Sequence, residues 1–140
     1  MAKFTAIALQ EVAAGANVQF TDNVIYGGRG IEHRIGAGIV TLRGITNQCF
    51  ARYRVSFGGN VQIPTGGTVE AISIALAVSG EPLASTTAIV TPAAVENLWH
   101  ITLLDHIDVP AGCCLTIAVE NTSTQPIEVQ NASLIVERIA

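Results

Sequence analysis

Residues 68–80 read Thr68-Val69-Glu70-Ala71-Ile72-Ser73-Ile74-Ala75-Leu76-Ala77-Val78-Ser79-Gly80. Large apolar side chains alternate with small ones along this stretch, which is the two-residue period of a β-strand. The large face predicts a contribution to a hydrophobic core. The small face carries no charge from Ala71 to Ser79, whereas a solvated strand face normally carries charged or polar residues. We therefore expect something to cover the small face, either the rest of the same chain in tightly stacked sheets or a neighbouring subunit.

The composition of the chain also predicts self-association. Charged residues make up 13% of the 140 residues and hydrophobic residues 49%, while about 25% charged residues is usual for a soluble domain. So few charges cover the surface of a monomer poorly, and a permanent subunit interface would remove the deficit. The net charge is −4 and the arginines are dispersed along the chain, which argues against a nucleic-acid partner.

The length predicts one domain, residues 1–140. The first residues lack a continuous apolar signal region, and no apolar run reaches the ~20 residues of a membrane span. We expect a chain made and kept in the cytoplasm without a signal peptide, unless a leader was removed, and no membrane partner. Cys49, Cys113 and Cys114 are expected to be reduced thiols in or near the core, because no metal-binding or redox spacing connects them.

Short alternating runs separated by glycine, proline and asparagine turns fill the remainder of the chain. The predicted strands cover residues 3–9, 17–21, 31–35, 38–43, 49–57, 68–80, 95–109, 113–120 and 127–139, and residues 84–92 fit an edge strand or an extended loop. No window shows a convincing helical period. About 8–10 strands of this kind predict an all-β fold, an antiparallel jelly-roll β-sandwich.

Three strands carry more specific expectations. Residues 49–57 form the clearest amphipathic strand, with one wet face, and Gly58-Gly59-Asn60 is expected to close it. Trp99, on a long strand, is expected to anchor the core. Residues 132–136 are apolar or small on both faces, so their strand is expected to be central in a sheet or to lie at a subunit contact.

The sequence contains no constellation that identifies a reaction. Tyr26–Gly30 is rich in glycine, but neither a helix pattern nor a Gly-Lys-Ser/Thr ending follows it, which disfavours a phosphate-binding loop. His33 is expected to be exposed or at an interface rather than a ligand. His100 and His106 share a strand face but lie about 20 Å apart, too far to bind one ion within a chain; only symmetry around a threefold axis could join copies of one histidine.

Asp105, Asp108 and Glu120 are the nearest approach to a carboxylate cluster, and they could meet at one end of a sandwich. A calcium site there has little support, because no spaced acidic loop is present. We expect no catalytic residues, no cofactor, no resident metal and no enzymatic activity, since neither a nucleophile set nor a cluster of histidines with a glutamate can be recognised.

Four segments together resemble a known family. They are Ala51-Arg52-Tyr53-Arg54-Val55-Ser56-Phe57, residues 72–82, residues 109–117 from Val109-Pro110-Ala111-Gly112 to Ile117, and residues 132–139. Their order resembles the tumour necrosis factor/complement-head jelly roll, and most closely its bacterial and phage members, such as the head of collagen-like spore-surface glycoproteins. The resemblance covers the chain from about Gly15 onward. It implies a compact homotrimer with one sheet of each subunit facing the threefold axis.

The resemblance, the charge deficit and the lack of catalytic residues lead to one expected function. We expect a non-enzymatic, homotrimeric decoration or fibre-head protein on a phage capsid or a similar particle surface, with itself and the particle as partners. No collagen stalk is present, so a free-standing trimer is expected. The alternative is an adhesin head that binds a glycan or receptor through loops such as 26–34 or 81–92. The residues expected at the subunit interface are Ala71, Ser73, Ala75, Ala77, His100, Leu104, Ser133 and Ile135.

Overall fold

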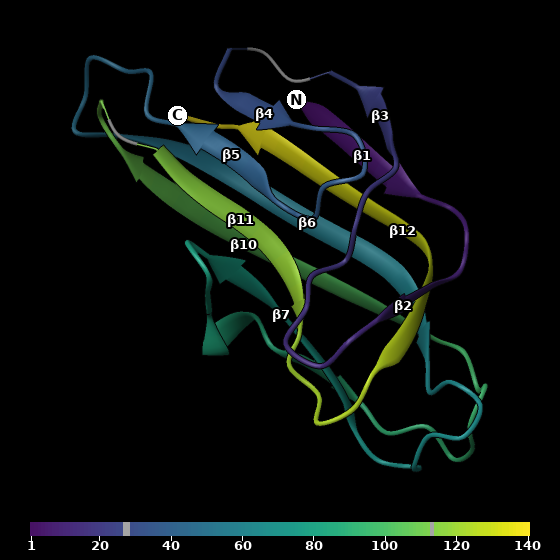
Figure 1. Ribbon diagram of the computed structural model, residues 1–140. Coiled ribbons are helices and arrows are strands. Elements are labelled where there is room, and N and C mark those ends of the chain that lie inside the picture. The colour runs from purple at the N-terminus through teal and green to yellow at the C-terminus, as the bar shows by residue number, and fades with distance from the viewer. Residues whose placement is uncertain (27–28, 113) are drawn as a thin grey trace.

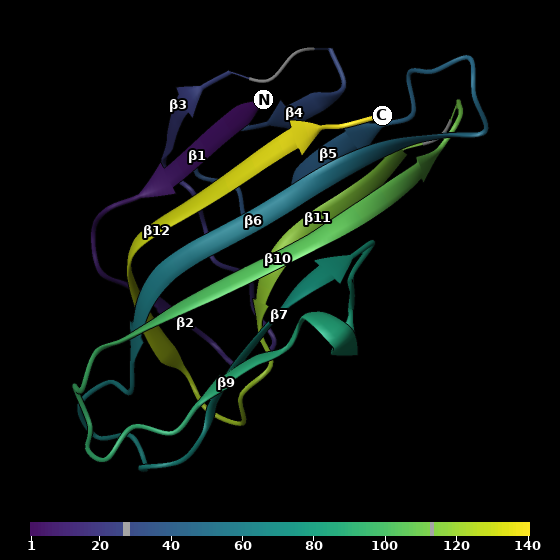
Figure 2. The ribbon, with the colours of Figure 1, turned by 180° about the vertical axis from the view of Figure 1, so that it is seen from behind.

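Two antiparallel sheets pack face to face in the computed structural model, which describes residues 1–26, 29–112 and 114–140. Figures 1 and 2 show the two layers from opposite sides. The described part of the chain has strands and a single 3-10 turn, η1 (Ala84–Thr86). It contains no helix with the length and apolarity needed to cross a bilayer.

Sheet A holds the longest strands. Its order is β10 (Trp99–Pro110), β6 (Phe50–Gln62), β12 (Ile127–Arg138), β1 (Ala2–Ala6) and β3 (Asp22–Ile25), with β2 (Gln10–Val12) also paired to β12. The first and last strands of the chain therefore lie side by side inside this sheet (Figure 1). The prediction that residues 132–136 lie in a central strand is confirmed.

Sheet B is built from shorter strands. Its order is β4 (Ile31–His33), β5 (Val40–Arg43), β11 (Cys114–Asn121), β7 (Ile72–Val78) and β8 (Glu81–Pro82), with β9 (Ala88–Val90) also paired to β7. Neighbouring strands in both sheets are largely non-consecutive in the chain, as a jelly roll requires. The predicted all-β jelly-roll sandwich is confirmed, and the strands exceed the expected 8–10 only because several have two to four residues.

The core lies between the sheets and is built from alternate residues of each strand. From β6, Tyr53, Val55 and Phe57 point inward with at most 3% of each exposed, while Arg52 and Arg54 point outward. From β7, Ile72, Ile74 and Leu76 are buried, as the period of the 68–80 stretch predicted. Burial of such side chains stabilises the fold by about 1.5–3 kcal/mol each.

The small face of β7 is largely closed within the single chain. Ala75 is 0% exposed and Ala77 is 2% exposed, whereas Ser73 is half-buried and Ala71 is exposed. Ala75 and Ala77 are thus buried within the single chain, as the alternative of tightly stacked sheets predicted, and their place at a subunit interface stays a prediction. The hydroxyl of Ser73 forms a hydrogen bond with that of Thr122 at 2.6 Å, so Ser73 also has its partner within the same chain.

Two expectations about strand ends were wrong. Gly58 and Gly59 do not close the strand, because β6 continues to Gln62 and pairs there with β10 and β12. A Cβ atom at Gly59 would lie 3.1 Å from Cζ of Phe57, so this glycine makes room for an aromatic ring. Trp99 does not anchor the core; it begins β10, an edge strand, and is 45% exposed.

Cysteine and histidine placements also differ from expectation. Cys49 and Cys114 are exposed rather than in the core, and Cys113 lies outside the described residues. His33 is half-buried: its Nδ1 lies 2.6 Å from Oδ1 of Asn23 and its Nε2 lies 2.9 Å from the carbonyl oxygen of Ala37. Its ring packs on Phe4 at 4.5 Å between centroids, so His33 joins β4 to sheet A rather than facing solvent.

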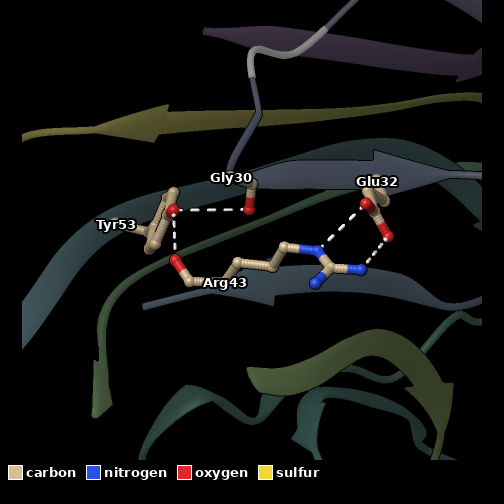
Figure 3. A network of polar contacts seen from close by, with 4 residues as sticks. All are labelled: Gly30, Glu32, Arg43 and Tyr53. Carbon is tan, nitrogen blue, oxygen red and sulfur yellow. Dashed lines mark hydrogen bonds and ion pairs between the residues drawn. The ribbon is translucent and has the colours of Figure 1, made fainter. Parts of the chain in front are cut away.

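Buried polar side chains close the two ends of the sandwich. At one end, the Tyr53 hydroxyl of β6 lies 2.8 Å from the carbonyl oxygen of Arg43 and 3.3 Å from that of Gly30, which joins sheet A to sheet B (Figure 3). At the other end, Asn121 is 0% exposed. Its Nδ2 donates to the carbonyl oxygens of Val12, Ala13 and Gln125, and its Oδ1 accepts from the Ser123 amide.

Candidate assembly surface

The outer face of sheet A is organised in rows that run across its three longest strands, β10, β6 and β12. Leu104, Ser56 and Ile135 form one row, because Ser56 pairs with Leu104 on one side and with Ile135 on the other. Thr102, Gly58 and Ser133 form the next row in the same way. The six residues of these rows are called the sheet A patch below. Residues so placed across strands are direct neighbours on one face.

The sheet A patch combines two large apolar side chains with four smaller residues and is open to solvent. Leu104 is 63% exposed and Ile135 is half-buried. The other four residues are smaller, so the surface is lower beside the two large apolar side chains. A shallow depression of about 500 Å³ lies here, lined by these six residues together with Phe57 and Leu103. Single exposed apolar side chains are ordinary on a protein surface, so the feature that makes this place a candidate contact surface is the depression beside Leu104 and Ile135.

Polar rows border the sheet A patch on the side toward the start of β6. His106, Arg54 and Glu137 form the adjoining row, and Arg54 pairs with Glu137 at 3.2 Å. Beyond it, Nε of Arg52 lies 2.7 Å from Oδ1 of Asp108. The hydrogen bond from Arg52 holds the pKa of the Asp108 carboxyl below its ordinary value.

The opposite border is also polar but uncharged next to the patch. The row of His100, Asn60 and Gln130 adjoins it, and Nδ1 of His100 lies 3.2 Å from Oδ1 of Asn60. A Cβ atom at Gly58 would lie 3.5 Å from Cε1 and Nε2 of His100, so the imidazole reaches the edge of the depression. An apolar centre with polar borders is the anatomy of a protein–protein interface.

The structure brings together four of the residues predicted at the interface. His100, Leu104, Ser133 and Ile135 lie on the outer face of sheet A, whereas Ala71, Ser73, Ala75 and Ala77 belong to or adjoin β7 in sheet B. The predicted set therefore divides between two sheets. Sequence reasoning missed Ser56, Gly58 and Thr102, because the register between strands, which places them beside Leu104 and Ser133, is not visible in a single sequence.

The carboxylates named as a potential cluster do not form a metal site. Asp108 is paired with Arg52 in sheet A, and Glu120 lies on β11 in sheet B. Within residues 1–26, 29–112 and 114–140, no group of three or more histidine, cysteine, aspartate or glutamate side chains could hold a metal ion. The glycine-rich segment Tyr26–Gly30 lies partly outside the described residues.

The sequence matches no protein-family model, and no curated protein is significantly similar to it. The fold, in contrast, is similar to solved structures. The globular domain of zebrafish complement 1qA protein matches with a TM-score of 0.57 and 9% identity over 96% of this chain and 94% of that chain. Murine APRIL, crystallised at pH 5.0, matches with a TM-score of 0.56 and 11% identity over 95% of this chain and 97% of that chain. The fold is therefore similar to the tumour necrosis factor/complement-head jelly roll, as the resemblance in sequence predicted.

Proposed function

We propose that the chain is a non-enzymatic structural head that forms a homotrimer through the sheet A patch. The observation that carries this proposal is the row of Leu104, Ser56 and Ile135 on the outer face of sheet A, in which Leu104 is 63% exposed. The low share of charged residues, 13%, supports it. A second copy of the chain is the proposed occupant of the patch. Association would remove the exposed apolar side chains from water, which is favourable for a chain with few surface charges.

A threefold ring sets a further condition on the contact. In a closed ring of three copies, the patch on one copy meets a different surface of the next. Ile89 is 67% exposed on β9, which lies beside β10 at the edge of the sandwich. The Ile89 side chain therefore projects from this edge and is of a size that a shallow depression lined by small residues can accept. The proposed contact therefore joins the β9 edge of one copy to the sheet A patch of the next.

A pair of matched variants tests the patch. Leu104→Lys places a charge in the proposed contact, and Ile35→Lys places one at an equally exposed site, since Leu104 is 63% and Ile35 is 61% exposed. Ile35 lies in the turn between β4 and β5 and does not line the depression of the sheet A patch. Light scattering after gel filtration is expected to show a trimer for the unmodified chain and for Ile35→Lys, and a monomer for Leu104→Lys. A folded Leu104→Lys trimer would remove the patch from the contact.

The proposed role of the trimer is to decorate a particle surface, such as a phage capsid or fibre tip. The head-like fold supports this role. Particles purified on a density gradient from the cells that make the chain provide the test. The chain is expected in the particle fraction by mass spectrometry, in a fixed ratio to the major particle protein. If the chain is found only in the fraction of free proteins, the proposed role on a particle surface is contradicted.

A glycan-binding head is the second candidate, and exposed aromatic rings favour it. Tyr26 is 73% exposed and Trp99 is 45% exposed, and aromatic side chains of this kind present a flat apolar face with a polar tip. A glycan array probed with the unmodified chain and with Tyr26→Ala and Trp99→Ala distinguishes the candidates. Binding that disappears in one of the variants supports the glycan reading, and a blank array leaves the structural role alone.

A further inference from the structure

A cavity of about 260 Å³ opens at the end of the sandwich that holds both chain termini. Three apolar side chains, Met1, Ile31 and Ile45, form part of its wall. Two arginines, Arg29 and Arg138, form another part, and Gly30 and Tyr53 complete the lining. This cavity is separate from the sheet A patch, because none of its lining residues belongs to that patch.

The lining of the cavity is cationic in a chain whose net charge is −4. It includes Arg29 and Arg138 but no acidic residue. Among the described residues, the ion pairs join Arg43 to Glu32, Arg52 to Asp108 and Arg54 to Glu137. Arg29 and Arg138 therefore pair with no acidic side chain in this part of the chain. Arg138 uses Nε to donate to the main-chain oxygen of Ala140, the last residue of the sequence, at 3.2 Å, which leaves its two terminal nitrogens for another acceptor.

Glu32, which follows the lining residue Ile31 in the sequence, is already paired. Glu32 on β4 accepts from Nε of Arg43 at 2.9 Å and from its second guanidinium nitrogen at 3.1 Å. In Figure 3 the Arg43 side chain extends away from the Tyr53 ring toward Glu32. Because the pair neutralises both charges, neither residue offsets the positive charge of Arg29 and Arg138.

The floor of the cavity is fixed before any ligand arrives. The Tyr53 hydroxyl is held by the carbonyl oxygens of Arg43 and Gly30 (Figure 3), and burial raises its pKa, so it stays protonated. A Cβ atom at residue 30 would lie 2.3 Å from this hydroxyl oxygen. Glycine is thus required for the tyrosine to occupy this position. Pockets for small molecules are usually preformed in this manner, with apolar walls and few polar groups.

We propose that this cavity binds a small organic oxyanion, a carboxylate or phosphate ester, through Arg29 and Arg138. Guanidinium groups recognise both classes with paired, charge-assisted hydrogen bonds. The apolar body of the ligand packs against Ile31 and Ile45. The site goes beyond the proposed structural role and does not depend on it.

Chemical-shift titration of the full chain tests the site with three probes that share one aromatic body. Benzoate carries a carboxylate, phenyl phosphate a phosphate ester, and benzamide no charge. The amide signals of Gly30, Ile31 and Ile45 are expected to shift saturably with benzoate or phenyl phosphate and to remain in place with benzamide. The tighter of the two anions identifies the preferred oxyanion. Equal shifts with benzamide, or no saturable shift with either anion, would overturn the proposal.

Arginine variants separate a built site from a general effect of charge. The double variant Arg29→Gln with Arg138→Gln is expected to weaken the anion at least about tenfold, the scale of one lost charge-assisted hydrogen bond. Arg34→Gln is the control, because Arg34 is an exposed arginine outside the cavity lining. An equal loss in the control, or unchanged affinity in the double variant with a well-dispersed spectrum, would contradict the assignment.

Discussion

Replacement of Asn121 by alanine is expected to lower the free energy of unfolding by about 3 kcal/mol. The side chain is 0% exposed. Its Nδ2 lies 3.0 Å from the carbonyl oxygen of Val12 and 3.1 Å from that of Gln125, and its Oδ1 lies 2.9 Å from the amide nitrogen of Ser123. The amide therefore joins β2, the end of β11 and the turn into β12.

The magnitude follows from the groups that lose their partner. An unsatisfied buried donor or acceptor costs about 1–3 kcal/mol. The contacts to Val12 and Ser123 are buried, while that to Gln125 is part-buried, so water can replace some of the loss. Asn121→Asp is expected to destabilise at least as much, because a buried carboxylate would face carbonyl oxygens instead of donating to them.

Urea denaturation at one fixed protein concentration measures the effect, since self-association makes the apparent stability depend on concentration. Asn47→Ala is the matched control: Asn47 is exposed in a loop, and its loss is expected to change stability by less than about 0.5 kcal/mol. If the free energy of unfolding of Asn121→Ala lies within about 0.5 kcal/mol of that of the unmodified chain, the buried hydrogen bonds of Asn121 do not stabilise the fold as expected.

Two further predictions concern the Tyr53 end of the sandwich and the polar border of the sheet A patch. Gly30→Ala is expected to lower the free energy of unfolding by about 1–3 kcal/mol, because its Cβ would lie 2.3 Å from the Tyr53 hydroxyl oxygen but 3.5 Å from Cζ. The double variant with Tyr53→Phe should lose less stability than the sum of the two single variants, because it lacks the clashing hydroxyl. Strictly additive losses in urea denaturation would argue against the clash. Asp108→Asn tests the Arg52 pair by pH. The folded-state pKa of Asp108 is lowered, so its contribution is present above the ordinary value of 3.8 and is lost as the pH falls through the lower value. The difference in urea midpoint between Asp108→Asn and the unmodified chain should be small at neutral pH and vanish in acid, and a difference that grows in acid would show the opposite linkage.

Local periodicity made the architecture predictable. The alternation in residues 51–57 and 72–78 indicated strands with a core face, and the structure buries Tyr53, Val55, Ile72 and Ile74 as that period requires. The low polarity of residues 132–136 correctly indicated a central strand. These predictions succeeded because the side-chain period of a strand is a local property of the sequence.

The site was predictable only in part, because it depends on pairing between distant strands. Leu104 and Ile135 were recognised separately, but Ser56 connects them only through the register of β6 with both neighbours. The burial of Asn121 was hidden within a polar turn. The prediction for Trp99 was wrong because its strand lies at the edge of the sheet. There, alternation of apolar side chains along the strand does not ensure that each of them is buried. A single sequence contains no direct signal for any of these.

Sedimentation equilibrium of the unmodified chain over a series of micromolar concentrations tests the central claim most directly. For a homotrimer, one species with three times the chain mass of 14.6 kDa is expected, stable across the series. A single species of 14.6 kDa at every concentration would contradict it, because the exposed row around Leu104 would then be an ordinary solvated surface.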